Sequence, residues 1–336
     1  MRSETRIAYN SLLSAMAVAY AVADQDTTKK FAITIPKETQ LNDAIQESNE
    51  FLNRITLMPV TDMEGQALRL GVNGLLAKRT DTSAGPRKGK ALGAPTGTEF
   101  KVAKTEFDVG IDYATLDQWA RLGDLREMYM PVVFNAIGLD RMSIGFHGSS
   151  VAVVTDPILN PLGEDVNIGW LELLRVNKPT HYLEEVVPLS NAINIGDTGD
   201  YKNLDALVAD LFASIPVEHR TGNEVAIVGS SLVAADTNKL YATHGTTPSE
   251  KQDILMMQNS YGGLPSMQVP KFHPMGALVT DPKNLHLYYQ QGRTRRSTKD
   301  ESDIDTVVDY ISSNDAYAIG NLDAIAGVNP ANVILV

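Results

Sequence analysis

The stretch that most constrains the fold of this chain is residues 115–148, TLDQWARLGDLREMYMPVVFNAIGLDRMSIGFHG. Its apolar residues recur three or four positions apart, which is the spacing of a helix that buries one stripe. Asp124 and Glu127 are spaced as in a capping box, so a short helix followed by a longer one also fits the pattern. Pro131 would then lie in the second turn of the longer helix, where a missing backbone donor predicts a bend. We interpret the stretch as a spine helix with Trp119 in the core.

Composition restricts the class of protein. The chain has 336 residues, of which 43% are hydrophobic and 21% are charged, as in globular proteins of about two domains. No apolar run is long enough to span a membrane. A formal charge of −12 argues against a dedicated DNA-binding role. The absence of cysteine excludes disulfides, cysteine catalysis and thiolate metal sites.

The N-terminus fits two interpretations. Arg2 and Arg6 precede an apolar run that ends in Ala21-Val22-Ala23, which has the small-x-small form of a signal cleavage site. This would suit a secreted periplasmic binding protein. Alternatively, the segment is an amphipathic helix whose apolar stripe contains Tyr9, Leu12, Leu13, Met16 and Tyr20.

Residues 74–98 are rich in Gly, Pro, Ser and Thr and contain a strongly basic centre. Strand-like residues flank this segment at 67–72 and 100–113, so we predict a long hairpin that projects from the body. A loop of this length normally serves a function or a partner, although a merely solvated loop is equally compatible. We expect an inter-subunit contact through the tip residues Lys78, Arg79, Arg87, Lys88 and Lys90.

A second unit begins near Asp200. Residues 201–216 have a clean helical stripe, and a short strand at 224–228 leads through Gly229 into another helix. Thr247 to Glu250 is typical of a further helix start, and strands are expected at 266–269, 277–280 and 285–290. This order predicts a compact α/β domain. Core positions are expected at Trp170, Leu204, Leu207 and Leu211.

Residues 293–305 carry four basic residues followed by four acidic residues. Such segregated charge is typical of a solvated loop or of a contact between like subunits. The contact interpretation assigns this role to Arg293, Arg295, Arg296, Asp300 and Glu301. Strands are expected at 306–312 and 316–319, and a tail at 327–336.

No motif supports catalysis. The turn at Gly229 resembles a phosphate loop but lacks both GxGxxG and GxxxxGK[ST], and no GxSxG occurs. The histidines lack metal-ligand spacing. We interpret His147 as part of a helix C-terminal cap and His273 as packed at a turn. We therefore predict no catalytic residue, cofactor or metal, and an α/β enzyme that binds a nucleotide at Gly229 remains a rival.

Short segments along almost the whole chain resemble the major capsid proteins of P-two-type contractile-tailed phages. The resemblance covers about residues 2–327, and it is specific because the segments keep their order and spacing. They include ETR at Glu4–Arg6, YATLDQWAR at Tyr113–Arg121, VNIGWL at Val166–Leu171, Gly199-Asp200-Tyr201, Gly263-Leu264-Pro265 and Arg295-Arg296.

This resemblance implies an α+β chain with the Hong Kong phage 97-type capsid fold. Its parts would be an N-terminal arm at 1–36, an extended hairpin loop at 61–112, an axial domain at 200–305 and a C-terminal tail at 327–336. A peripheral domain would combine 37–60, 113–199 and 306–326 around the spine helix 115–148. The charged loop 293–305 would lie near the capsomer centre or its rim.

The function implied by the resemblance is a major capsid protein that assembles into pentamers and hexamers of an icosahedral head around double-stranded DNA. The implied partners are other copies of the chain, a scaffold protein, a portal and a maturation protease that cuts near Lys29 to Phe31. Contact with DNA would be non-specific, and no membrane is involved. The protein would assemble in the bacterial cytoplasm and remain in the virion. We do not predict covalent cross-linking through the loop lysines.

Overall fold

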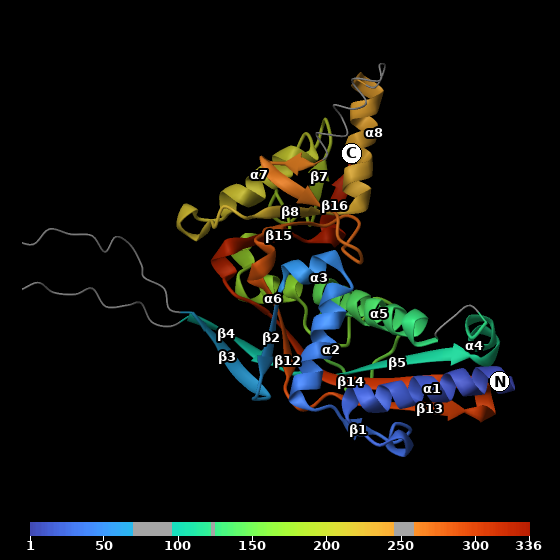
Figure 1. Cartoon of the computed structure of the whole chain (residues 1–336). Helices are drawn as coiled ribbons and strands as arrows, with labels where there is room; N and C mark the ends of the chain where they lie inside the picture. The colour runs from blue at the N-terminus through green and yellow to red at the C-terminus, as the bar shows by residue number, and fades with distance from the viewer. Residues whose placement is uncertain (70–95, 122–124, 245–258) are drawn as a thin grey trace, which may run out of the picture.

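The computed structural model describes residues 1–69, 96–121, 125–244 and 259–336. Figure 1 shows two sheets, one above the other, with a hairpin that leaves the body on one side. The six-stranded lower sheet has the order β1-β13-β14-β12-β2, and β5 pairs with β14 outside this path. Its strands are β1 (Phe31–Ala32), β2 (Thr56–Val60), β5 (Ala103–Asp112), β12 (Leu285–Gln290), β13 (Arg295–Glu301) and β14 (Thr306–Ile319).

The long strand β14 organises the lower sheet. Its first half pairs with both β13 and β5, and its second half pairs with β12. The two strands expected at 306–312 and 316–319 are therefore one strand. The expectation of a loop at 293–305 is wrong, because β13 occupies Arg295–Glu301 and pairs with β14 over its whole length. Backbone pairing overrides the solvated appearance of this charged sequence.

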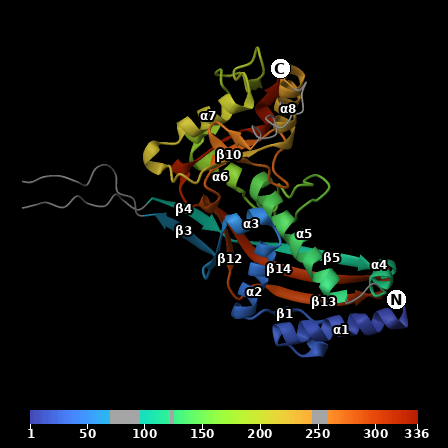
Figure 2. The same cartoon turned by 45° about the horizontal axis from the view of Figure 1, so that its top comes forward.

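Helices cover one face of the lower sheet. They are α1 (Ser3–Tyr20), α2 (Ile35–Glu47), α3 (Glu50–Arg54), α4 (Tyr113–Trp119) and α5 (Leu125–His147). Buried side chains of α1, α2, α4 and the first part of α5 share one cluster with Phe107, Val307 and Ile311 of the sheet, whereas those of α3 belong to the cluster that spans both sheets. Figure 2 shows α1 along the edge where β1 and β13 lie, with α5 crossing above β14.

The spine stretch 115–148 forms two helices, α4 and α5, as one form of the prediction allowed. Residues 122–124, which include the expected capping residue Asp124, lie outside the described residues. Pro131 lies inside α5, which continues through it to His147. The bend at Pro131 stays a prediction. Upstream of the hairpin, residues 35–54 form the two consecutive helices α2 and α3.

The upper sheet has the order β6-β15-β11-β8-β10-β9. Its strands are β6 (Tyr182–Leu183), β8 (Val225–Val228), β9 (Ser260–Tyr261), β10 (Leu264–Met267), β11 (Ala277–Thr280) and β15 (Ile325–Val328). Helices α6 (Trp170–Asn177), α7 (Leu204–Ser214) and α8 (Ser230–His244) pack around it. The helix expected after Thr247 lies largely outside the described residues.

The expected C-terminal tail is wrong. Residues Ile325–Val328 form β15 inside the upper sheet, and β16 (Val333–Leu335) pairs in parallel with β7 (Ile193–Ile195). Val328 is fully buried and Val333 is 6% exposed. Val328 and Val333 therefore belong to the apolar cluster of the upper sheet, whereas Ile334, Leu335 and Val336 expose 43–58% of their area.

The expected hairpin is confirmed at its base. Strands β3 (Glu64–Arg69) and β4 (Thr96–Lys101) pair antiparallel and project from the body. The tip between them lies outside the described residues.

Besides the long connection between β5 and β6, two short segments of the described chain cross from one sheet to the other. Residues 281–284 join β11 above to β12 below, and residues 320–324 join β14 below to β15 above. One apolar cluster spans both sheets, including Leu278 and Ile325 above and Leu285 and Ile319 below. The boundary expected at residue 305 therefore does not follow the sheets, because β12 and β13 belong to the lower sheet and β15 to the upper one.

Candidate assembly surfaces and the junction between the sheets

The base of the hairpin is anchored to the lower sheet by aromatic packing. The ring of Phe100 meets Tyr288 edge-on at 4.8 Å between centroids, and Val102 beside it is buried. Lys101 forms an exposed ion pair with Glu64 across the two strands at 2.5 Å. The predicted tip residues Lys78, Arg79, Arg87, Lys88 and Lys90 all lie outside the described residues, so their contact stays a prediction.

The charged side chains of residues 293–301 differ in exposure and in bonding partners, because successive residues of β13 point to opposite faces of the sheet. Arg293 and Arg295 are exposed, whereas Asp300 accepts a hydrogen bond from Arg6 of α1 at 3.4 Å and another from the Tyr113 hydroxyl. Glu301 accepts from the Tyr310 hydroxyl at 3.5 Å. Asp300 thus connects the N-terminal helix to the start of α4.

Arg296 does not lie on a surface, which corrects its predicted role as a contact residue. Its side chain is fully buried and its Nε donates to Asp309 Oδ1 at 3.0 Å, with a second bond to the other carboxylate oxygen. Tyr129 of α5 and Thr298 also donate to Asp309, at 3.1 and 3.0 Å. The position faces the helices because alternate residues of β13 point to opposite faces of the sheet.

The Arg296 guanidinium also holds the N-terminal helix. Its Nη1 donates to the Tyr20 hydroxyl at 2.7 Å, and the guanidinium carbon lies 5.5 Å from the centre of the Tyr20 ring. The amphipathic stripe of α1 is confirmed, with Tyr9, Leu12, Met16 and Tyr20 buried. Leu13 is only partly buried.

Glu38 of α2 is a buried polar residue that the sequence analysis missed. Its carboxylate is fully buried and accepts from the backbone amides of Gly292 and Thr294 at 2.6 and 3.0 Å. It thereby fixes the break between β12 and β13. A lone Glu on a helix has no sequence feature that marks it as buried.

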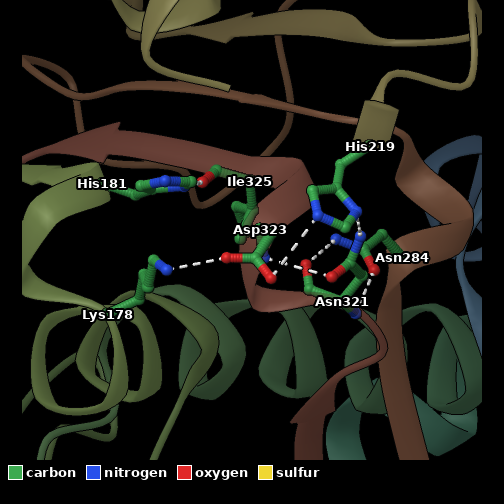
Figure 3. A network of polar contacts seen from close by, with 7 residues as sticks. All are labelled: Lys178, His181, His219, Asn284, Asn321, Asp323 and Ile325. Carbon is green, nitrogen blue, oxygen red and sulfur yellow. Dashed lines mark hydrogen bonds and ion pairs between the residues drawn. The ribbon is translucent and has the colours of Figure 1, made fainter. Parts of the chain in front are cut away.

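A polar network fastens the two crossing segments together (Figure 3). The Asn284 side chain donates to the Asn321 carbonyl at 3.0 Å and accepts from the Asn321 amide at 2.6 Å. Lys178, at the end of α6, forms an ion pair with Asp323 at 2.7 Å, and His219 lies 3.8 Å from the same carboxylate. The hydrogen bond from Lys178 lowers the pKa of Asp323 below its ordinary value.

A pair of histidines forms a second connection between the units. The rings of His147 and His273 lie 3.7 Å apart. His147 Nε2 donates to the Lys271 carbonyl at 2.9 Å, and His273 Nε2 donates to the Phe146 carbonyl at 3.2 Å. These reciprocal bonds join the end of α5 to the loop before β11. Burial first, and the neighbouring His147 second, lower the pKa of His273 to about 4.

The turn at Gly229 is filled by the chain itself. A Cβ at Gly229 would lie 2.1 Å from the Pro274 carbonyl oxygen, which accepts from the amides of Ser231 and Leu232 at 3.0 and 3.4 Å. The first turn of α8 therefore directs amides at Pro274, where a phosphate loop would direct them at a ligand. This geometry does not support the nucleotide-binding alternative.

Four of the five predicted core residues are buried. Trp170 is fully buried, and its indole nitrogen donates to the His286 carbonyl at 3.0 Å. Leu204, Leu207 and Leu211 pack against the upper sheet. Trp119 is only partly buried at the edge of the helical cluster.

The described part of the chain contains no cluster of three His, Asp or Glu side chains able to hold a metal ion. Among the helices of that part, none is long and apolar enough to cross a membrane.

An exposed apolar segment was also missed. In the loop 149–166 that follows α5, Val153, Val154, Ile158 and Leu159 each expose at least 78% of their area, and Val151 exposes 53%. The sequence VAVVTDPIL has neither helical nor alternating periodicity, so it gave no basis for a burial prediction.

Comparisons with known proteins cover the whole chain. A family model described as phage major capsid protein, P2 family, matches residues 8–330. The chain is 32% identical over 332 residues to "Capsid proteins" of Escherichia phage P2, covering 95% of this chain and 92% of that protein. It is 30% identical over 339 residues to the major capsid protein of Serratia phage KSP20, covering 98% and 97%.

Among the solved structures, a procapsid chain is similar over 99% of its length. A chain of the satellite phage P4 procapsid that includes the size determination (Sid) protein matches with a TM-score of 0.79 and 31% identity, covering 100% of this chain and 99% of that chain. The Hong Kong phage 97-type capsid fold is confirmed. The family match includes most of the N-terminal apolar run, so the periplasmic binding protein is not supported. The chain belongs to the P2 family of phage major capsid proteins, which form the shell of the virion.

Proposed function

We propose that this chain assembles into pentamers and hexamers of an icosahedral shell that encloses double-stranded DNA. The observation that carries the proposal is the full-length match to a chain of a procapsid, which includes both sheets, the helices and the hairpin base. The protein acts by associating with other copies of itself, and no catalytic step is involved. Closed symmetric assembly adds many modest contacts, because each copy takes part in several interfaces at once.

The charge of the chain suits a container for DNA. A formal charge of −12 repels phosphates, so the packaged DNA is held without a high-affinity site and any contact is non-specific. Assembly in the host cytoplasm, with a scaffold protein and a portal, is part of the same proposal.

The expected protease site falls at an exposed position. Lys29 and Lys30 are exposed directly before Phe31, where β1 begins. Cutting there would leave α1 attached only through non-covalent contacts, among them the bond between Tyr20 and Arg296 and the ion pair between Arg2 and Asp117 of α4. We infer that α1 serves as the assembly arm and that the protease controls its release.

Electron microscopy of the purified full-length chain tests the shell proposal. Shells, rings or tubes are expected, whereas uniformly small particles at high concentration would contradict it. Particles boiled in denaturant should release one monomer band, because we predict no cross-linking. A ladder of multimers would contradict that prediction.

Charge reversal tests the basic hairpin tip. The double variant Lys88→Glu, Lys90→Glu should weaken assembly while the melting temperature stays unchanged, because the positive tip contacts an acidic surface of another copy. A matched control is Lys37→Glu, a lysine on α2 outside the hairpin. Unchanged assembly of the tip variant would contradict the contact.

A further inference from the structure

The loop after α5 presents a strip of apolar side chains to solvent. We call Val151, Val153, Val154, Ile158 and Leu159 the apolar strip. Four of them expose between 78% and 103% of their area, and Val151 exposes 53%. Single exposed apolar residues are common on proteins, but a contiguous group of this kind marks a surface that another molecule covers.

The backbone of the apolar strip is held in place by acidic side chains. Asp165, which is 9% exposed, accepts from the Asp156 amide at 2.8 Å, and Asp156 in turn accepts from the amides of Ile158 and Leu159 at 2.9 and 3.2 Å. The Ala152 amide donates to the Asp165 carbonyl at 2.8 Å. A loop ordered before binding loses little conformational entropy when it docks, which favours its use as a contact.

The local charge favours a second copy of the chain as the partner. Between residues 149 and 163 only Asp156 is ionisable, and its carboxylate is turned back onto the loop amides. Two copies that each carry a formal charge of −12 repel one another through their net charge. A nearly uncharged apolar surface is where such copies can approach closely.

A groove extends this surface towards the hairpin base. It has a volume of about 790 Å³, and Val151 of the apolar strip lines it together with Phe100, Ile168 and Leu173. Strip and groove are therefore continuous. The groove also contains Glu64, Glu99 and Lys101, of which Glu64 and Lys101 form an ion pair, so the uncharged part of the combined surface is the apolar strip and the apolar side of the groove.

We propose that the apolar strip and its adjoining groove form an inter-subunit contact surface whose occupant is a second copy of this chain. The inference rests on the proposed shell assembly and specifies one of its contacts. It assigns to residues 151–159 a role in association that is separate from the hairpin tip and from the N-terminal arm.

Photo-cross-linking tests the partner. A photoreactive amino acid placed at Val153 of the full-length chain should, in assembled particles, give a product of twice the monomer mass. Its cross-link should map to a peptide of a second copy. The same variant dissociated to monomers before irradiation is the control and should give no such product. Particles that yield no cross-link, or a cross-link only to a different protein, would overturn the assignment while leaving shell assembly intact.

A matched pair of substitutions measures how much the apolar strip contributes to assembly. Val154→Ser should raise the protein concentration needed for assembly about tenfold, because burial of one valine is worth about that factor in association. The control Val217→Ser changes a similarly exposed valine outside the strip, 73% against 84%. Equal effects of both variants, or a lowered melting temperature for Val154→Ser, would contradict the proposal. Wild-type particles are counted by microscopy in parallel, and their absence would contradict both the contact and the shell.

Discussion

At the scale of single residues, the buried pair of Arg296 and Asp309 determines how the N-terminal helix is held. Both side chains are fully buried, and each is bonded to residues of different elements. A buried charge that loses its partner is strongly destabilising, because its desolvation is no longer offset. This pair therefore gives the sharpest residue-level prediction.

Arg296→Met should lower the free energy of unfolding by about 3–5 kcal/mol, since Asp309 would remain buried without its counter-ion. Arg295→Met, at the adjacent and exposed position of β13, is the control. It should change the free energy of unfolding by less than about 0.5 kcal/mol. Urea unfolding of the unassembled chain measures both. Similar values for the two variants would contradict the buried pair.

The histidine pair predicts a pH dependence. His273 takes up its proton at a pKa of about 4 in the folded protein, against an ordinary value of 6.5. The unfolded chain therefore binds more protons between these values, and stability falls as the pH is lowered from 6.5 towards 4. His273→Asn should make this fall shallower. Melting temperatures of both proteins across this range measure the difference, and parallel curves would contradict the assignment.

At the scale of elements, Pro131 conflicts with the helix that contains it. Proline removes a backbone donor from the interior of α5, yet the helix continues to His147. The cost is tolerated because α5 packs on the lower sheet through Tyr129, Val133 and Ile137. Tertiary packing thus overrides local propensity.

Pro131→Ala should raise the free energy of unfolding by about 1–2 kcal/mol, because alanine restores the donor and Pro131 is exposed. Val132→Ala, at the neighbouring exposed position, is the control and should have little effect. Thermal unfolding provides the measurement. A lower melting temperature for Pro131→Ala would show that the proline is required where it is.

At the scale of the whole molecule, the two crossing segments join the sheets into one unit. Asn284 and Asn321 bond side chain to backbone across them, and the Gly320 amide donates to the Asn284 carbonyl at 2.9 Å. The shared apolar cluster lies next to this junction. Removing one amide should therefore weaken the whole chain rather than one element.

Asn284→Ala should lower the free energy of unfolding by about 1–3 kcal/mol, because backbone groups of Asn321 lose their partners. The variant should still unfold in one cooperative transition, because both sheets share one apolar cluster. Asn223→Ala, on the surface, is the control. Two separate transitions in calorimetry would contradict the coupling.

The sequence by itself determined the elements whose patterns are local. The stripe of α1, the helices α5 and α7, the strands β11 and β12 and the hairpin base were all predicted, because a buried face leaves a period in the chain. The ordered motif resemblance along the chain was sufficient to predict the capsid family.

Only the tertiary structure decided which charged side chains are buried and whether the C-terminal residues pack against the rest of the chain. Arg296 was assigned to a surface and Val333 to a tail, because neither the partner Asp309 nor the partner strand β7 is close in sequence. The apolar strip was missed for the opposite reason, since its exposure depends on what the rest of the fold leaves uncovered. Periodicity records how one element meets the core, whereas long-range pairing depends on the whole chain.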